Sequence, residues 1–205
     1  MDRKALYNLE YGVFLLASRA GERINGCITN TCIQAAANPT RLAICCINGN
    51  YTPELIAESG LFTVSVLDST VGFETIRRFG MQSGREVDKF AGVNYALDDN
   101  GVPYLLAEAN AVLSCRVVSS QDLGSHTLFI GEVLDARVLS PNASLTYAKY
   151  QSDIKPRPQP KAETRPIVGW RCKICGYVYE GAELPKDFAC PLCGHGPEDF
   201  EPVYG

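Results

Sequence analysis

Apolar positions in the first three quarters of the chain fall in short runs that are bounded by Gly, Pro or Asn. Short runs rich in β-branched and apolar residues are typical of β-strands. Many strands with few helices favour a barrel over an alternating parallel sheet, so the pattern predicts a mainly β fold with short helical insertions. The predicted strands are Tyr11–Ser18, Arg41–Ile47, Leu61–Leu67, Ala111–Val118 and Thr127–Val138.

Two short helices are predicted between these strands. The first has Thr52 as its N-cap, Pro53 at its first helical position and Gly60 as its terminator. The second begins near residues 68–70 and ends near residues 78–80. Two helices among so many strands leave the β character of this part of the chain unchanged.

A proline-rich segment divides the chain. Prolines at 156, 158, 160 and 166 remove backbone donors and favour an extended conformation. We therefore predict a first domain over residues 1–150, a linker over 151–168 and a second domain over 169–205. The linker has two interpretations that remain open: a tether between the domains, or a strap at an oligomer interface.

Composition and charge exclude several classes of protein. The chain has 205 residues, with 19 basic and 23 acidic side chains and a net charge of −4, so we expect no nucleic-acid partner. Its longest apolar runs, such as Val13–Ala17, are far shorter than a membrane span, so we expect no membrane association. The chain has nine cysteines, an odd number, and its first residues do not resemble an export signal. Both observations argue against a set of disulfides and predict a reducing, cytoplasmic setting.

Four of the cysteines are grouped near the C-terminal end. Cys172 and Cys175 form one Cys-x-x-Cys pair, and Cys190 and Cys193 form a second pair. Fourteen residues separate Cys175 from Cys190. A two-residue spacer lets one turn direct both sulfurs at a single ion, and the glycine after each pair permits the left-handed conformation that such a turn needs. The spacing therefore predicts a tetrahedral four-thiolate site for zinc or iron. Two structural disulfides are not expected in a reducing compartment.

The residues around these pairs narrow the choice of metal. Five aromatic residues predict a small dry core beside it: Trp170, Tyr177, Tyr179, Phe188 and Phe200. With the strings Cys-Gly-Tyr-Val-Tyr-Glu-Gly and Leu-Pro-Lys-Asp-Phe-Ala-Cys-Pro-Leu-Cys-Gly, residues 169–205 resemble rubredoxin, in the short form found in rubrerythrins. The resemblance implies one iron ion held by the four cysteines. Zinc ribbons share the Cys-Pro-x-Cys-Gly turn, so zinc remains the alternative.

The first domain lacks the usual nucleotide and metal motifs. The sequence contains no Gly-x-Gly-x-x-Gly, no Walker loop and no His, Asp or Glu cluster with ligand spacing. Chemistry there is expected to come from a bound organic cofactor. Two polar stretches, Asn25–Gln34 and Ile47–Pro53, are candidates to hold it, and the second opens a helix whose free amides suit a phosphate. Each stretch alone is also consistent with ordinary turns and caps.

The order of several short motifs along the first domain says more about its family than any one motif does. The ordered pieces are Asn25-Gly26, Thr29–Gln34, Asn38-Pro39, Asn48, Thr52, Phe62–Leu67, Arg78–Gly80, Asp88–Gly92, His126–Val133 and Leu145–Tyr147. In this order, residues 5–150 resemble the flavin reductase-like family with the FMN-binding split-barrel fold. The resemblance implies an obligate homodimer, with the flavin ring on residues 28–31 and its phosphate at residues 48–52. The FMN-binding residues it implies are Thr29, Asn30, Thr31, Gln34, Asn48, Asn50 and Thr52, with Lys89 and His126 as additions.

Several of these residues have plainer interpretations. Lys89 is equally consistent with a solvated side chain, and His126 with a loop or interface residue. Cys45 and Cys46 are adjacent and point to opposite faces of a strand, so they do not chelate one ion together. The five cysteines outside the metal site are predicted to be small buried hydrophobes: Cys27, Cys32, Cys45, Cys46 and Cys115. Cys32 lies in the predicted flavin segment and is the one of the five to test for reactivity.

The two predicted cofactors complement each other. A flavin accepts a hydride and returns single electrons, whereas an Fe(Cys)₄ centre takes one electron at a time. The whole arrangement resembles the high-molecular-weight rubredoxins of anaerobes. This resemblance implies an NAD(P)H-dependent FMN oxidoreductase that also carries electrons. It would receive the electrons of NAD(P)H directly or through an NADH:rubredoxin-type reductase. It would deliver them to a flavodiiron protein that reduces dioxygen or nitric oxide. The alternatives are a flavin or ferric reductase that releases its product, and a zinc-ribbon interaction module on a flavin-binding scaffold.

Overall fold

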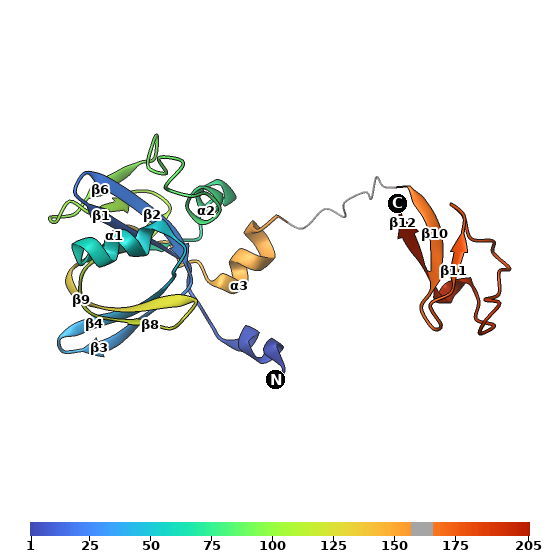
Figure 1. Cartoon of the computed structure of the whole chain (residues 1–205). Helices are drawn as coiled ribbons and strands as arrows, with labels where there is room; N and C mark the ends of the chain where they lie inside the picture. The colour runs from blue at the N-terminus through green and yellow to red at the C-terminus, as the bar shows by residue number, and fades with distance from the viewer. Residues whose placement is uncertain (157–165) are drawn as a thin grey trace. The chain divides into compact units, whose positions relative to one another are not determined.

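The computed structural model describes residues 1–156 and 166–205. The chain forms two compact units, Met1–Pro156 and Arg157–Gly205, which we call unit 1 and unit 2 (Figure 1). Each unit has its own hydrophobic core. The two are therefore described separately.

Unit 1 is built on an antiparallel sheet of seven strands in the order β2-β1-β5-β8-β9-β4-β3. These strands are β1 (Phe14–Ala20), β2 (Arg23–Thr29), β3 (Cys32–Ala37), β4 (Thr40–Ile47), β5 (Leu61–Leu67), β8 (Ala109–Asp122) and β9 (His126–Val138). A separate pair consists of β6 (Tyr95–Leu97) and β7 (Pro103–Leu105). The helical elements are η1 (Arg3–Asn8), α1 (Tyr51–Ser59), α2 (Phe73–Gly80), α3 (Tyr147–Lys149) and η2 (Tyr150–Ile154). The mainly β prediction is confirmed.

The sheet curls so that its two edges meet. β2 and β3 are the edge strands, and the short turn at Asn30 and Thr31 joins them. At this turn the Cys45 N–H donates to the Thr31 carbonyl oxygen at 3.2 Å, and the Thr29 hydroxyl donates to the Cys45 carbonyl oxygen at 3.0 Å. These bonds connect the end of β2 to β4, which lies five places away in the sheet order. We call this contact the barrel seam.

The five predicted strands all occur, with shifted ends. β5 spans the predicted residues, whereas β1 begins at Phe14 and continues to Ala20. β8 and β9 are longer than predicted because they pair with each other beyond the core, as far as the hairpin at their exposed ends. β2 and β3 were not predicted as separate strands, since Asn, Gly, Gln and Ala dilute their β-branched residues.

Strand β1 is buried on both faces, which explains its continuous apolar run. Leu15 packs in a cluster with α2 and the loops that follow it, and Leu16 packs inside the barrel. Both side chains are fully buried, and each contributes about 1.5–3 kcal/mol of transfer free energy. Inside the barrel, Phe62 lies so close to Gly131 that an added Cβ would be 2.4 Å from its ring. Glycine is therefore required at that position of β9.

The predicted start of the first helix is wrong by two residues. Asn50, not Thr52, occupies the N-cap position of α1, in an extended conformation and without a side-chain cap hydrogen bond. Thr52 is instead fully buried, and its hydroxyl oxygen accepts a hydrogen bond from the Asn25 amide at 3.0 Å. The predicted terminator is correct: Gly60 has a φ of +70°, and its N–H donates to the Ile56 carbonyl oxygen at 2.8 Å.

The second helix starts later than predicted. α2 begins at Phe73 with Gly72 as its N-cap, and it ends at Gly80 as expected. Residues 68–70 form a turn instead, because the Asp68 carboxylate accepts hydrogen bonds from the Thr70 N–H at 2.8 Å and from its hydroxyl at 2.6 Å. A side chain that satisfies the backbone locally in this way competes with helix formation.

Helical structure continues into the segment predicted as linker. Tyr147, Tyr150 and Ile154 pack against the same core cluster of unit 1, which places 151–154 in the helical η2 rather than in an extended strand. The strand β10 begins at Ile167, one residue before the predicted end of the linker. The choice between tether and strap concerns residues 157–165, which lie outside the described residues.

Unit 2 is a small sheet beside a pair of turns. Its strands are β10 (Ile167–Cys172), β11 (Val178–Glu180) and β12 (Phe200–Tyr204), in the order β11-β10-β12, with η3 (Pro197–Asp199) before the last strand. The predicted aromatic core is present: the Phe188 ring lies 5.5 Å from that of Phe200 and 4.8 Å from that of Tyr179, measured between centroids. In the part of the chain that the structure describes, no helix is long and apolar enough to cross a membrane.

Candidate functional site

The four cysteines of unit 2 converge on one point. The sulfur atoms of Cys172, Cys175, Cys190 and Cys193 all lie within 4.8 Å of one another. The Cys172 and Cys193 sulfurs are 3.6 Å apart, and those of Cys175 and Cys190 are 3.4 Å apart. A tetrahedron with metal–sulfur bonds of about 2.3 Å has edges of about 3.8 Å. The donor set therefore fits a single tetrahedral metal ion.

Each Cys-x-x-Cys turn is closed by the glycine that follows it. Gly176 and Gly194 have φ values of +80° and +74°, a conformation that side-chain-bearing residues rarely adopt. Their N–H groups donate to the Cys172 and Cys190 carbonyl oxygens at 2.9 and 2.8 Å. Backbone groups of the next residues also bond to the sulfurs: Tyr177 to Cys175, Leu192 and Cys193 to Cys190, and His195 to Cys193.

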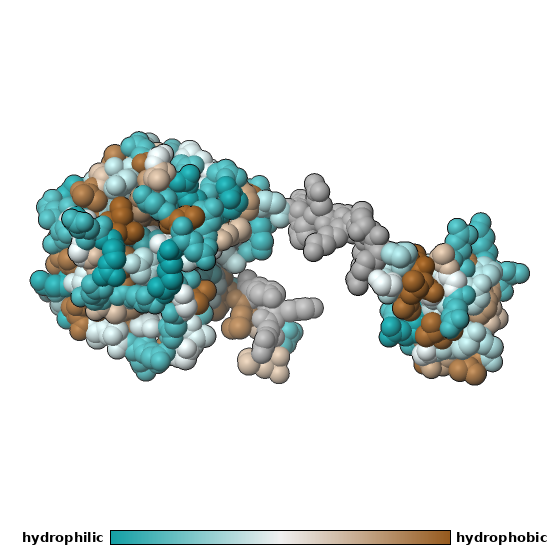
Figure 2. All heavy atoms as spheres, turned by 45° about the horizontal axis from the view of Figure 1, so that its top comes forward, coloured by the Kyte–Doolittle hydropathy of each residue, from teal (hydrophilic) through white to brown (hydrophobic). Residues whose placement is uncertain are grey.

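The metal centre is asymmetric in its exposure. Cys172 and Cys190 are buried against the aromatic core, whereas Cys175 is exposed. Ile174 and Leu192, each inside one Cys-x-x-Cys pair, are 58% and 72% exposed. Figure 2 shows apolar atoms on the visible surface of unit 2. One side of the centre is thus open, with apolar side chains beside it.

Unit 1 contains two adjoining hollows near the barrel seam. The first has a volume of about 230 Å³ and the second about 340 Å³. Both are lined by Ile28, Ile47, Asn50, Gly80 and Met81, so they form one elongated site. We call the first the ring hollow and the second the phosphate hollow, after the part of a flavin that each would hold.

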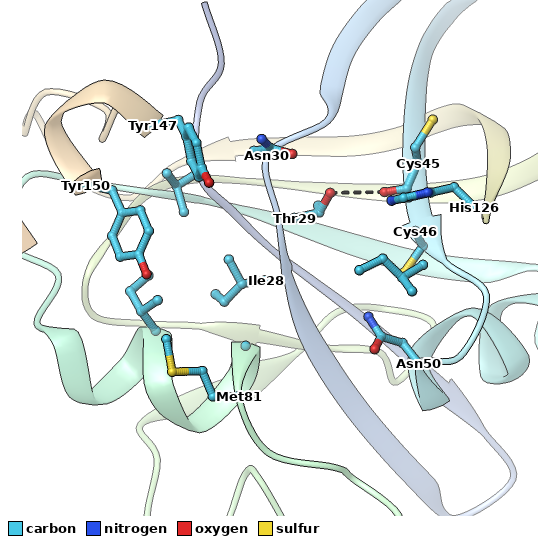
Figure 3. A pocket seen from close by; sticks show the side chains of 14 residues that line it. Ile28, Thr29, Asn30, Cys45, Cys46, Asn50, Met81, His126, Tyr147 and Tyr150 are labelled. Atoms are coloured by element: carbon cyan, nitrogen blue, oxygen red, sulfur yellow. Dashed lines mark hydrogen bonds between the residues drawn. The ribbon is translucent and has the colours of Figure 1, made fainter. Parts of the chain in front are cut away.

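The ring hollow combines apolar walls with a polar edge (Figure 3). Tyr147, Tyr150 and Met81 lie on one side of it, and Ile28 lies between them and the polar edge formed by Asn50 and His126. Apolar surfaces of this kind suit a flat heterocyclic ring, and polar side chains at its edge orient it. Thr29 and Asn30 complete the lining at the end of β2.

The phosphate hollow lies at the N-terminus of α1. Its lining includes Gly49, Asn50 and Thr52 from the start of the helix, and Lys89 from the loop after α2. Lys89 is only 5% exposed, and its ammonium group donates to the carbonyl oxygens of Gly26 and Phe79, each at 3.0 Å. Burial lowers the pKa of this ammonium group, while the Cys27 and Cys46 thiols act in the opposite direction. A helix N-terminus beside a buried cation fits an anionic group.

The structure brings most of the predicted flavin residues to these hollows. Thr29, Asn30 and His126 line the ring hollow, Thr52 and Lys89 line the phosphate hollow, and Asn50 lines both. The alternative interpretation of Lys89 as a solvated side chain is wrong, because that side chain is buried.

Three predicted residues line neither hollow. The Thr31 hydroxyl donates a hydrogen bond to the side-chain oxygen of Asn30 at 3.2 Å. Thr31 therefore contacts a residue that lines the ring hollow but does not line the hollow itself. Gln34 is exposed on β3 and donates to the Ala36 carbonyl oxygen. The Asn48 amide group is engaged at the hairpin of β8 and β9, where its bonding partners are Asp122, Gly124 and Thr127.

Met81, Tyr147 and Tyr150 also line the ring hollow, although they were not predicted as site residues. The two tyrosines are three positions apart on consecutive helical turns, a spacing that places them on one face. That signal was available in the sequence, but no helix was predicted over residues 147–154, because the predicted linker began at residue 151. Met81 carried no signal, because its position depends on where α2 ends.

Comparison with known proteins identifies both units. Residues 6–154 match the flavin reductase like domain family, and residues 170–201 match the rubrerythrin, rubredoxin-like domain family. The chain is 36% identical over 230 residues to a high molecular weight rubredoxin of Moorella thermoacetica, covering 99% of this chain and 100% of that protein. It is 41% identical over 150 residues to a ferric-chelate reductase (NAD(P)H) of Archaeoglobus fulgidus, covering 73% of this chain and 89% of that protein.

Solved structures agree with the fold of unit 1. The NADH:FAD oxidoreductase SgcE6 of Streptomyces globisporus has a TM-score of 0.64 and 25% identity, over 70% of this chain and 85% of that protein. A flavoredoxin of Methanosarcina acetivorans has a TM-score of 0.58 and 28% identity, over 63% of this chain and 69% of that protein. The split-barrel prediction is thereby confirmed.

These matches indicate the cofactor of each unit. The flavin reductase domain implies a flavin, and the hollows of unit 1 fit its ring and phosphate. The rubredoxin-like domain with its four converging thiols implies one iron ion. The protein is accordingly an oxidoreductase or electron carrier. With a flavin reductase domain followed by a rubredoxin domain over nearly its whole length, the chain belongs to the high molecular weight rubredoxins.

Proposed function

We propose that this protein carries electrons from NAD(P)H through FMN in unit 1 to the iron centre in unit 2, and from there to an acceptor protein. The observation that carries the proposal is the presence in one chain of a hollow fitting a flavin and an open four-thiolate centre. The flavin supplies the conversion of a hydride into single electrons. Covalent connection keeps the two centres at a high effective concentration.

The lining residues have distinct proposed roles toward FMN. Thr29, Asn30, Asn50 and His126 would orient the ring, since their polar groups lie at the edge of the ring hollow. Lys89 and the N-terminus of α1 would hold the phosphate, with Thr52 beneath it. We propose FMN as the flavin, because one hollow suits its ring and the adjoining hollow at the N-terminus of α1 suits its single phosphate.

The iron centre would pass electrons on at its open side. Cys175 is its exposed ligand, and the apolar side chains of Ile174 and Leu192 beside it offer a docking surface. We propose a flavodiiron protein as the acceptor, a homodimer as the working assembly and the cytoplasm of an anaerobe as the setting. The family resemblance supports these partners, and analytical ultracentrifugation with a pull-down of the acceptor tests them.

Stopped-flow reduction tests the electron path. The holoprotein is mixed anaerobically with NADH or with NADPH, and the flavin and Fe(Cys)₄ absorption bands are followed separately. The proposal expects flavin bleaching first and iron bleaching second. Iron that stays oxidised while the flavin is fully reduced would contradict it, and a colourless unit 2 would favour the zinc-ribbon alternative.

A second candidate is a reductase of ferric chelates or free flavin. The relative from Archaeoglobus fulgidus favours it, since its name describes that activity and its similarity covers 73% of this chain. Retention of FMN during gel filtration separates the two, because a reductase that releases reduced flavin loses it on the column. A rate of ferric citrate reduction that does not change when the iron centre is removed would favour this candidate.

A further inference from the structure

Two cysteines of unit 1 contact each other across the barrel seam. Cys27 lies on β2 and Cys46 lies on β4, and their sulfur atoms are 3.5 Å apart. Both side chains are buried, at 3% and 2% exposure. Because β2 and β4 are not neighbours in the sheet order, this contact exists only where the barrel closes.

The two sulfurs lie beside the elongated site. Cys27 lines the phosphate hollow together with Thr52 and Lys89, and Cys46 lines the ring hollow near Asn50 (Figure 3). The pair is thus held in the barrel wall but is reached from the hollows. When the flavin is absent, a small oxidant that enters either hollow meets one of the two sulfurs.

The surroundings make the two thiols unequal. A hydrogen bond from Cys46 is the main cause that lowers the pKa of Cys27; burial opposes it, and Thr52, Lys89 and Asn50 add to the lowering. The same hydrogen bond, with burial and the negative charge on Cys27, raises the pKa of Cys46. Cys27 is therefore the nucleophile of the pair, and Cys46 holds the proton.

Other cysteines of unit 1 lack this activation. Burial raises the pKa of Cys32 to about 12, and burial together with nearby negative groups raises that of Cys115 to about 12. A thiol in that state is a poor nucleophile at neutral pH. Cys27, rather than Cys32 in the predicted flavin segment, is therefore the cysteine of unit 1 to test for reactivity.

We propose that Cys27 and Cys46 form a redox-active dithiol that hydroperoxides oxidise to a disulfide. The Cys27 sulfur attacks the peroxide, so that an S–O bond forms, the O–O bond breaks and the alcohol or water leaves with the second oxygen. The Cys46 sulfur then attacks the sulfenic acid at Cys27; the S–S bond forms, and the hydroxyl group leaves as water with the Cys46 proton. One peroxide is reduced for each dithiol oxidised, and an external dithiol reverses the change by exchange.

The step needs little movement. The sulfur atoms, already in contact at 3.5 Å, have to close to about 2.05 Å. The product ties β2 to β4 across the seam, directly beside both hollows. This inference is independent of the proposed electron path, since it concerns only the two thiols.

Peptide mapping of the full-length protein, with its iron centre intact and its flavin removed, tests the proposal. The protein is treated with a slight excess of hydrogen peroxide, the remaining thiols are alkylated with N-ethylmaleimide, and the digest is analysed by mass spectrometry. We expect a disulfide-linked pair of peptides that contain Cys27 and Cys46, which dithiothreitol separates again. Full alkylation of both residues after peroxide treatment would overturn the proposal.

Variants separate the roles of the two thiols. In Cys46→Ser, Cys27 retains a hydroxyl neighbour but no partner sulfur, so we expect a sulfenic acid at Cys27 that dimedone traps. Cys115→Ser is the matched control, because Cys115 is equally buried inside the barrel and should leave the Cys27–Cys46 crosslink unchanged. Equal loss of the crosslink in the control would overturn the proposal. The mapping of the unmodified chain decides the matter even where a variant does not fold.

Discussion

The ammonium nitrogen of Lys89 lies 3.0 Å from the carbonyl oxygen of Gly26, inside the wall that separates the phosphate hollow from the core. No carboxylate pairs with this cation among the contacts of the described residues, since its two acceptors are carbonyl oxygens. A buried cation without a counterion is costly for the folded protein alone. A bound phosphate would offset that cost, so Lys89 connects folding to flavin binding.

Removing the Lys89 charge should weaken flavin binding. A hydrogen bond to a charged group contributes about 1.5–3 kcal/mol, so Lys89→Met should raise the Kd for FMN by about 10- to 100-fold. Flavin fluorescence titration of the apoprotein measures the change. Lys186→Met, which removes an exposed lysine of unit 2, is the control with the same loss of charge. Equal affinities of the two variants would remove Lys89 from the site.

The same lysine predicts a pH dependence of stability. Burial holds the pKa of Lys89 below its ordinary value. At a pH below the pKa of Lys89 in the folded protein, both the folded and the unfolded chain carry the proton, so burial of the charge destabilises the folded chain in full. Between that pKa and the pKa of about 10.4 in the unfolded chain, only the unfolded chain carries the proton. The free energy of unfolding of the apoprotein should therefore rise with pH just below that value. Urea unfolding at several pH values checks this against Lys89→Met, in which the rise should be absent.

The hydroxyl group of Thr52 should be required for a buried hydrogen bond. Thr52→Val keeps the shape of the side chain but leaves the Asn25 amide without its acceptor. Loss of such a partner costs about 1–3 kcal/mol. Denaturant unfolding should show this loss, and FMN affinity should fall with it. Thr52→Ser retains the hydroxyl and should behave like the parent chain; a serine variant as unstable as the valine variant would point to packing instead.

Loss of one metal ligand should unfold unit 2 without affecting unit 1. Cys172→Ser removes a buried ligand, and small metal domains fold only with their ion. Trp170 is the single tryptophan of the chain and packs in the aromatic core, so its emission reports unit 2 alone. We expect a red shift of that emission and loss of the iron absorption, with FMN still bound. Cys115→Ser should change neither signal of unit 2.

The close contact of Gly131 with Phe62 should make the barrel intolerant of a single methyl group. In Gly131→Ala the new Cβ would lie 2.4 Å from the Phe62 ring, and overpacking of this kind costs about 1–3 kcal/mol. Gly49→Ala is the control, since no atom lies within 4 Å of a Cβ there. Urea unfolding compares the two, and Phe62→Leu should recover part of the loss in Gly131→Ala.

The metal centre and the main strands could be predicted because their signals are local. The four cysteines, their glycines and the aromatic residues lie within a short segment, and five of the seven residues of strand β5 are apolar, with Thr63 and Ser65 between them. The start of α1 was misplaced because Thr52 has the composition of a cap but is bonded to Asn25 of another strand. The same bond could not be inferred from either residue alone.

The pocket was predicted only in part because it is assembled from distant segments. Residues near the end of β2 and the start of α1 carried a family resemblance, whereas Met81 and Tyr150 join them only through the positions of α2 and η2. The burial of Lys89 depends on the loop after α2 reaching the Gly26 carbonyl oxygen. Such contacts are set by tertiary packing and leave no periodic pattern in the sequence.

Because strand β1 places Leu15 in one core cluster and Leu16 in the other, unit 1 has no plane along which it can come apart in stages. If either cluster loosens, strand β1 loses the packing on one of its faces, and the other cluster then loses a strand that it also depends on. Heat or urea should therefore denature unit 1 in a single cooperative transition. The flavin site, whose walls draw on both clusters, would be lost in that transition rather than before it.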